Sequence, residues 1–176
     1  MPLAGRGTCR FRGHGLSRLD GCGFDRGRFY GSGFQGSFLG AFRLDRRGDL
    51  KGTDGVAWSI DRSTPDVPSP LLSGSRLYFF AARRGMISCV DAPTGKAHYS
   101  AQRIEEIREV YASPVAADGK VFLTSRDGTT VVIEDADSYK VVAINRLGEG
   151  VDATPAIAGR EIFLRGQSSL YCFSRP

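Results

Sequence analysis

A Ser/Thr-Pro step recurs three times in this chain of 176 residues, and it constrains the fold more than any other feature. The prolines are Pro70, Pro114 and Pro155, so the steps are 44 and 41 residues apart. Each step opens a short apolar stretch, and proline fits the first residue of a β-strand, where no ladder hydrogen bond is lost. A unit of this length cannot bury both faces of its own sheet, so the copies must pack on one another.

The same order of residue types follows each proline. A short strand leads to a glycine turn, then to a strand rich in β-branched and aromatic residues, a second glycine turn and a third strand. Asp118-Gly119 is a strong hairpin signal, because such a turn requires positive φ. The first set of turns contains Gly74, Gly119 and Gly159, and the second contains Gly85, Gly128 and Gly166. A fourth strand is predicted in two copies, at 97–101 and 141–144.

No stretch of the repeat region shows a convincing helical period, which indicates an all-β protein. Copies of this length are typical of four-stranded propeller blades. We therefore predict a partial β-propeller of three to four four-stranded antiparallel blades in an incomplete ring, with another all-β repeat or a sandwich as the alternative. The predicted blades span residues 38–64, 67–102, 110–147 and 151–176.

The heptapeptide VDAPTGK at 90–96 resembles the turn signature of the pyrroloquinoline-quinone-type β-propeller repeat family. In that family an aspartate ends the third strand and a Thr-Gly pair forms the turn into the fourth. Asp91, Thr94 and Gly95 match that pattern, and such side chains can bond nearby backbone amides while glycine takes positive φ. The second copy, at 134–140, has no glycine, and the third copy ends before the turn.

The resemblance covers about residues 41–176. Before the first Ser/Thr-Pro step, 43–45 and 56–58 resemble a third strand and a fourth strand that ends in Trp58. Propellers of this type without a cofactor site act in protein–protein contacts, as in the outer-membrane assembly lipoprotein and many repeat-bearing bacterial proteins. The resemblance therefore implies a non-catalytic protein-binding or scaffold module whose contact surface lies on its loops. The candidate loops are 48–55, 102–109 and 146–150.

The alternative implied by the resemblance is a remnant of a quinone-dependent dehydrogenase. Enzymes of that family are full rings that hold the quinone in a central funnel with a calcium ion, and commonly have an adjacent pair of cysteines. This chain has no adjacent cysteines and only about three and a half copies, whereas closed propellers have ~4–8 blades. Motifs for other enzyme chemistry are absent as well. We therefore predict no catalytic residues, no cofactor and no metal site.

Four cysteines and two histidines give no metal-binding spacing. Cys89 and Cys172 occupy the same place in the third strand of their copies, where the second copy has Val132. This predicts a small buried packing position. One blade lies between the two cysteines, so we expect no disulfide between them. His98 lies in a predicted fourth strand and is expected on the surface.

Residues 1–40 differ from the rest in composition. They contain eleven glycines, five phenylalanines and six arginines, and the strand pattern begins only at Phe38. We expect an irregular segment, and either of two explanations would account for it. It is a disordered Arg/Gly tail that could bind RNA by charge and stacking, or a non-native stretch produced by a shifted reading frame or a mispredicted start.

Charge gives little indication of a nucleic-acid partner. The formal charge is +5, but residues 1–40 contribute +4 and the remaining 136 residues only +1. No apolar run is long enough to span a membrane, and the first residues lack the apolar core of a signal peptide. The resemblance favours a periplasmic or secreted protein, but the residues themselves leave the compartment unknown.

The last copy ends at its third strand, so one blade face and one strand edge should lack a partner. Unpaired edges and apolar faces promote association. We therefore expect a fragment of a longer propeller, a self-associating oligomer or a poorly soluble chain. The expected partner is an unknown protein or a second copy, bound through the exposed blade faces.

Overall fold

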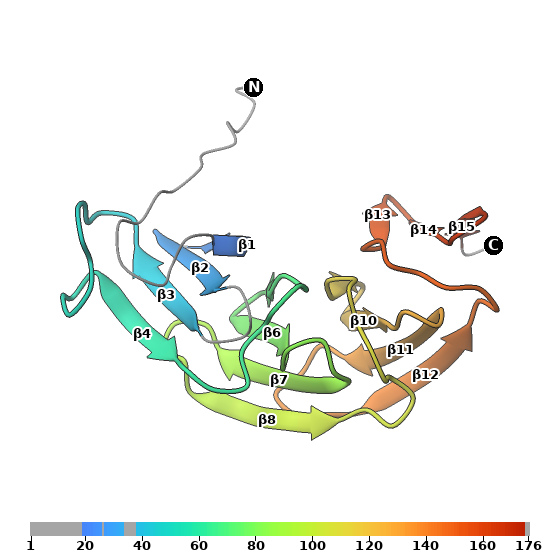
Figure 1. The fold of residues 1–176 in the computed structure, drawn as a ribbon, viewed down its shortest axis with the longest axis horizontal. Helices are drawn as coiled ribbons and strands as arrows, with labels where there is room; N and C mark the ends of the chain where they lie inside the picture. Colours follow the sequence, from blue (N-terminus) through green and yellow to red (C-terminus); the bar gives the residue numbers. More distant parts are fainter. Residues whose placement is uncertain (1–18, 26, 34–37, 175–176) are drawn as a thin grey trace.

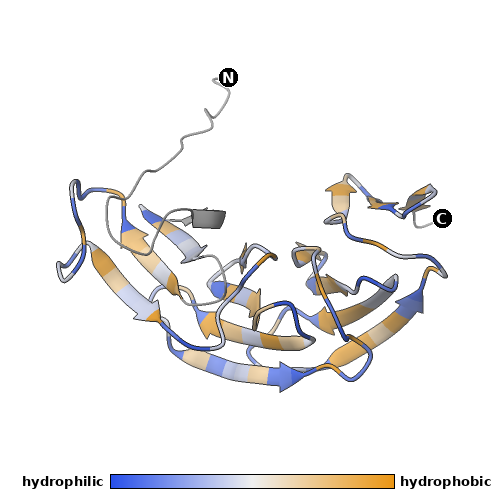
Figure 2. Ribbon diagram, viewed as in Figure 1, coloured by the Kyte–Doolittle hydropathy of each residue, from blue (hydrophilic) through white to orange (hydrophobic). Residues whose placement is uncertain are grey.

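The computed structural model describes residues 19–25, 27–33 and 38–174, which form four antiparallel sheets arranged along an arc (Figure 1). This confirms the predicted all-β fold and the partial propeller. Hydrophobic residues follow the strands and hydrophilic residues gather in many of the connecting loops (Figure 2). We call the sheets blades 1 to 4, in chain order.

The strands have the following bounds. Blade 1 contains β1 (Leu19–Asp25), β2 (Arg28–Gly33), β3 (Leu39–Arg43) and β4 (Val56–Ile60). Blade 2 contains β5 (Leu71–Ser73), β6 (Arg76–Phe80), β7 (Met86–Asp91) and β8 (Ala97–Arg103). Blade 3 contains β9 (Val115–Ala117), β10 (Lys120–Thr124), β11 (Thr129–Glu134) and β12 (Val141–Arg146). Blade 4 contains β13 (Ala156–Ala158), β14 (Glu161–Arg165) and β15 (Leu170–Ser174).

Blade 1 begins earlier than the sequence predicted. The expectation of one irregular segment over 1–40 does not hold for β1 and β2, which pair antiparallel and complete a four-stranded sheet with β3 and β4. The predicted first blade, 38–64, therefore becomes 19–60. The sequence gives no clear strand signal here because β1 and β2 contain several glycines and no β-branched residue. Phe29 stands opposite Phe42, and Gly31 opposite Gly40. Residues 1–18, to which the tail hypotheses still apply, lie outside the described residues.

Neighbouring blades share apolar cores because blade 2 is apolar on both faces. On β6, Tyr78 and Phe80 pack in the cluster shared with blade 3, whereas Leu77 and Phe79 pack in the cluster shared with blade 1. This alternation follows from the two-residue period of a strand. Blades 1 to 3 thus each hide a face that they could not bury alone, as the repeat predicted.

The Ser/Thr-Pro steps link successive blades. Each proline directly precedes the first strand of blade 2, 3 or 4. Before Pro114 and Pro155, the hydroxyl of the preceding residue accepts a hydrogen bond from the equivalent amide of the preceding blade. Ser69 N donates to Ser113 Oγ (2.8 Å), and Ser113 N donates to Thr154 Oγ1 (3.0 Å). The recurring dipeptide therefore positions neighbouring blades as well as opening a strand.

The turns adopt the geometry that their residues favour. Gly74, Gly119 and Gly159 have φ of +57°, +66° and +60°, between the first two strands of blades 2 to 4. In the VDAPTGK turn, Thr94 N donates to Asp91 Oδ1 (2.9 Å) and Gly95 has φ +72°. Asp and Thr here satisfy backbone amides and glycine reverses the chain.

Connections between blades cross the turns of their neighbours. The amide of Arg126 donates to Glu109 O (2.9 Å), and Val151 N donates to Arg126 O (3.0 Å). Gln167 N repeats the pattern with Gly150 O at 3.0 Å. Each connection is thereby held against the turn between the second and third strands.

The equivalent third-strand positions have different environments. In three successive blades, strand register places Cys89 opposite Tyr78, Val132 opposite Phe122, and Cys172 opposite Phe163. Cys89 is buried and its pKa is raised to about 12 by burial, and Val132 is buried as well. Cys172 is exposed, so the prediction of a buried position is wrong there. The reason is that no described blade covers that face of blade 4.

Candidate functional site

An apolar groove separates blade 4 from blade 3. It has two adjoining parts of about 540 and 520 Å³, which share Phe122, Ile162 and Phe173. Leu164 and Tyr171 line the first part, together with residues of β12 and of the segment that follows it. Buried clusters fill the space between the other neighbouring blades. The last blade is therefore the one that packs incompletely on its neighbour.

The groove does not result from unsuitable residues. The second and third strands pair in the same register in blades 3 and 4. The blade 4 residues that face blade 3 are therefore equivalent to the blade 3 residues that face blade 2. The blade 3 residues Val121, Leu123, Val131 and Ile133 are all 0% exposed. Phe173, which corresponds to Ile133, is 49% exposed. Blade 4 has apolar residues at these places, but within the described residues it has three strands where blade 3 has four.

The outer face of blade 4 is also uncovered. Leu170 is 72% exposed, and Cys172 lies exposed on the same face of β15. The equivalent residues of blade 2, Ile87 and Cys89, are both 0% exposed beneath blade 3. An exposed apolar face of this kind is typical of an interaction surface.

The outer edge of β15 has free backbone groups. Gly166 N donates to Ser169 O, so the main chain of Ser169 faces β14. Main-chain groups alternate between the two sides of a strand, so those of Leu170 and Cys172 face away from β14. In blades 2 and 3 the equivalent edge pairs with β8 or β12. No strand within the described parts of the chain pairs with the edge of β15.

Glu149 holds blade 4 to the connection that precedes it. Its carboxylate accepts hydrogen bonds from Tyr171 Oη (2.6 Å), Ser168 Oγ (2.7 Å) and Ser168 N (2.8 Å). These bonds lower the pKa of Glu149 to about 2, and the bond from Tyr171 has the largest effect. Sequence reasoning placed this residue in a contact loop, 146–150, but gave no sign that it supports blade 4.

Acid should therefore loosen blade 4 before the rest of the arc. The folded-state pKa of Glu149 lies below the ordinary value of 4.5, so its contribution is complete above about pH 4.5 and is lost as the pH falls towards 2. We expect amide hydrogen exchange in β14 and β15 to accelerate over this range, after correction for the intrinsic pH dependence. Glu149→Gln should remove most of this pH dependence, and an unchanged profile in the variant would contradict the assignment.

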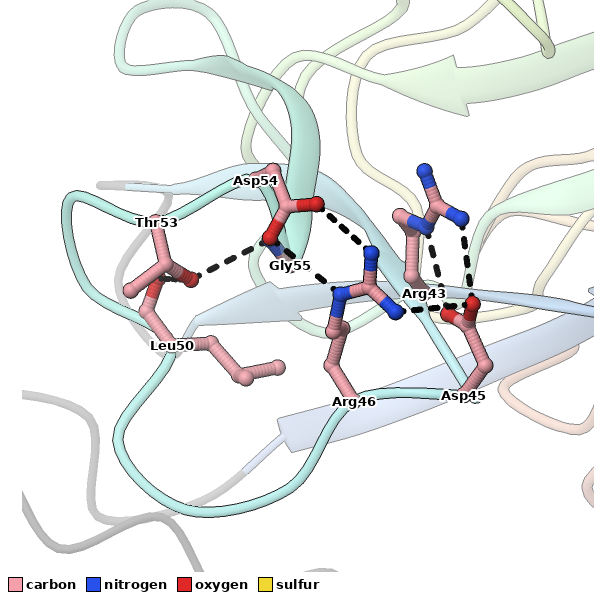
Figure 3. Close-up of polar contacts among 7 residues, drawn as sticks. All are labelled: Arg43, Asp45, Arg46, Leu50, Thr53, Asp54 and Gly55. Atoms are coloured by element: carbon pink, nitrogen blue, oxygen red, sulfur yellow. Dashed lines mark hydrogen bonds and ion pairs between the residues drawn. The ribbon is translucent and has the colours of Figure 1, made fainter.

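The opposite end of the arc is covered by its own loop. The segment between β3 and β4 folds back so that Leu50, which is 7% exposed, packs with Phe29 and Phe42 on the outward face of blade 1. Arg46 braces the loop by bonding Asp54 Oδ2 (2.7 Å), as Figure 3 shows.

Further contacts fix Leu50 within this loop. Thr53 Oγ1 donates to Leu50 O at 2.8 Å, and Gly55 N donates to Thr53 Oγ1 at 3.1 Å (Figure 3). A Cβ at Gly55 would lie 2.7 Å from Leu50 Cδ2. The loop 48–55, predicted as a contact surface, thus places its one large apolar side chain against its own blade.

Leu50→Ala should expose the aromatic residues of blade 1 and lower the free energy of unfolding by about 2–3 kcal/mol. The matched control is Leu44→Ala in the same loop, because Leu44 is 52% exposed. We expect that control to change stability by less than about 0.5 kcal/mol. Urea denaturation followed by circular dichroism measures both. Equal losses in the two variants would show that Leu50 does not cap the blade.

The loop 102–109, also predicted as a contact surface, contributes two residues to the core between blades 2 and 3. Ile104 and Ile107 are buried in the cluster shared by blades 2 and 3, whereas the exposed residues of the loop are polar or charged: Gln102, Arg103, Glu105 and Arg108. Glu109 accepts a hydrogen bond from Arg126 Nη1 at 3.1 Å, and Arg126 lies over the ring of Tyr111. The Arg-Asp-Gly turn at 126–128 is thus held by side-chain contacts between blades.

Among the described residues, no group of three or more His, Cys, Asp or Glu side chains could hold a metal ion. The same residues include no helix that is long and apolar enough to cross a membrane.

No family model and no curated protein matches the sequence. Solved structures do resemble the fold. BamB from Moraxella catarrhalis is 19% identical with a TM-score of 0.67, over 89% of this chain and 46% of that one. The computationally designed Ika4 protein is 11% identical with a TM-score of 0.70, over 97% and 99% of the two chains. A europium-containing methanol dehydrogenase is 14% identical with a TM-score of 0.56, over 75% and 25%.

These similarities concern the fold. The chain spans about half the length of BamB and a quarter of that of the methanol dehydrogenase. They agree with the predicted likeness to quinone-type propellers in architecture. At these low identities they show the fold alone.

Proposed function

We propose that this chain is a non-catalytic scaffold of quinone-type propeller repeats that binds another protein at blade 4. One observation carries the proposal: the two ends of the arc differ. Leu50 covers the outward face of blade 1, whereas blade 4 leaves an apolar groove and an apolar outer face open to solvent. Repeat arrays bury their apolar faces against neighbours, and the exposure of Leu170 and Phe173 on blade 4 supports a binding surface there.

The residues of the open end suit protein binding. Phe173 and Tyr171 line the groove from β15, and Phe122 lines it from blade 3. Partly exposed aromatic residues in a concave apolar setting are the usual anchors of protein interfaces. The strands hold these residues in place before a partner binds, so little conformational entropy is lost on binding.

The dehydrogenase alternative has less support. Likeness to the methanol dehydrogenase extends over a quarter of that enzyme and concerns the fold alone. A titration with quinone and calcium keeps the alternative testable. Saturable quinone absorbance, or quinone-dependent electron transfer to a dye, would replace the scaffold proposal with the enzyme.

Site-specific photo-crosslinking in cells that express the chain tests the proposed surface. A photoreactive residue at Leu170 should capture one defined protein, whereas the same residue at Leu44, on the capped end, should not. The captured protein is then purified, and its affinity is measured for the wild type and for Phe173→Glu and Leu44→Glu. We expect Phe173→Glu to weaken binding by roughly tenfold or more and Leu44→Glu to leave it unchanged. A partner that responds to neither variant would overturn the placement at blade 4.

A further inference from the structure

We propose that the partner binds as an extended strand, antiparallel to β15, and so completes blade 4. This inference rests on the proposed function and specifies the chemistry of the ligand. Three of the four sheets have four strands, and in blades 2 and 3 the last strand pairs antiparallel with the third. Blade 4 has its first three strands in the same order and register.

The pairing of β12 with β11 defines the register of the missing strand. Val132 stands opposite Ala143 and Thr130 opposite Asn145. Leu170 and Cys172 occupy the places of Thr130 and Val132, and their main-chain groups face the open edge, as argued above. A strand laid in the place of β12 would therefore meet those free groups with its own. Strand addition at a sheet edge takes its affinity from such main-chain hydrogen bonds.

The side chains of the incoming strand are constrained by the groove. In blade 3, Ile144 stands opposite Val131 and Val141 opposite Ile133. Tyr171 and Phe173 occupy these two third-strand places in blade 4. Aliphatic residues opposite Tyr171 and Phe173 would cover the exposed ring of Phe173 and close the groove. The partner should thus carry apolar residues at these two places.

The edge of β15 lacks the usual protection against strand pairing. Natural edge strands are blocked by charged residues, proline or bulges. The strand β15, with the sequence LYCFS, has neither a charge nor a proline, and its pairing with β14 is regular. A second copy that closed a ring would fit this end less well than a strand, because ring closure would place blade 4 on the outward face of blade 1. Leu50 already covers that face.

A synthetic peptide with the sequence of residues 138–148 is the probe, because it contains β12, the fourth strand of blade 3. Titrated into isotope-labelled protein, it should shift the backbone amide signals of Leu170 and Cys172 saturably, with one peptide bound per chain. A scrambled peptide of the same composition should leave these signals unchanged.

Backbone methylation separates strand pairing from side-chain docking. Leu147 N donates to Gly128 O, so the amides of Asn145 and Leu147 face β11, whereas that of Ile144 faces away. N-methylation of the peptide at Asn145 should weaken binding by roughly tenfold or more, through a lost hydrogen bond and a steric clash. N-methylation at Ile144 is the matched control and should change affinity by less than about threefold, since no pairing bond is lost.

A pair of protein variants tests the same edge from the other side. Cys172→Pro removes an N–H that faces away from β14, and proline is tolerated at an open edge. It should abolish peptide binding, whereas Cys172→Ala should retain it. Circular dichroism and thermal unfolding check that both variants fold.

Each outcome decides the proposal. Sensitivity to methylation at Asn145 and to Cys172→Pro supports it. No binding by the wild type, or equal loss with both methylated peptides, overturns it. Light scattering tests for a dimer. A dimer would identify a second copy as the occupant, and overturn the proposal too, if it persisted at saturating peptide and if Cys172→Pro dissociated it. A partner crosslinked at Leu170 that binds without pairing to β15 would overturn strand addition and leave the scaffold function standing.

Discussion

Replacing Tyr78 by alanine should lower the free energy of unfolding by about 3–5 kcal/mol. Tyr78 is 0% exposed and lies in the core between blades 2 and 3. Its hydroxyl donates a hydrogen bond to Asp135 Oδ1 at 2.8 Å, and burial raises the pKa of the phenol, so it remains a protonated donor. The alanine variant leaves a cavity between two blades and removes a partner of a carboxylate from another blade. Guanidinium denaturation, followed by circular dichroism and by the fluorescence of Trp58, measures the loss.

Tyr78→Phe separates packing from hydrogen bonding at this position, and Phe173→Ala is the control for an exposed aromatic ring. Tyr78→Phe keeps the ring and should cost about 1–3 kcal/mol, because Asp135 loses one donor but keeps Ser73 Oγ. Phe173→Ala removes an aromatic ring that is 49% exposed, and should cost about 1 kcal/mol or less. If Tyr78→Phe were as damaging as Tyr78→Ala, the hydrogen bond rather than the packed ring would hold the blades together.

Gly128→Ala should lower the free energy of unfolding by more than about 3 kcal/mol. Gly128 has φ +85°, and a Cβ there would lie 2.0 Å from Glu149 O. The turn between β10 and β11 and the connection to blade 4 would have to separate. The measurement is chemical denaturation, with amide exchange at Glu149 and Val151 as a local report on the displaced connection.

Gly119→Ala is the matched control for this variant. Gly119 also has positive φ, +66°, but a Cβ there would have no atom within 4 Å. We expect only the backbone strain of about 1–2 kcal/mol. Similar losses in the two variants would mean that the close approach of Glu149 contributes nothing beyond conformational strain.

The architecture was predictable because its determinants are local in sequence. Gly74, Gly119 and Gly159 have positive φ and form the turn in each of their blades. In the turn of Asp91, Thr94 and Gly95, the side chain of Asp91 accepts a hydrogen bond from a backbone amide of the same turn. The period of the Ser/Thr-Pro steps then fixed the repeat length. Blade 1 was harder, because Gly31 and Gly40 pair within strands although glycine usually marks turns.

The site at blade 4 was only partly predictable, because it depends on what lies beside each residue. Cys89 and Cys172 have equivalent strand positions, yet one is buried and the other exposed. The unpaired edge follows from counting strands, and the sequence predicted it. Leu50 as a cap and Glu149 as a brace follow from long-range packing, which leaves no periodic signal in the chain.

The crossing of each turn by the next connection has a consequence for synthesis. The backbone bonds of Arg126 with Glu109 and of Val151 with Arg126 join segments that lie close together along the chain. A nascent chain can therefore complete and lock each blade as soon as the following connection leaves the ribosome. Blade 1, covered by its own loop, can act as the template on which the later blades are laid down.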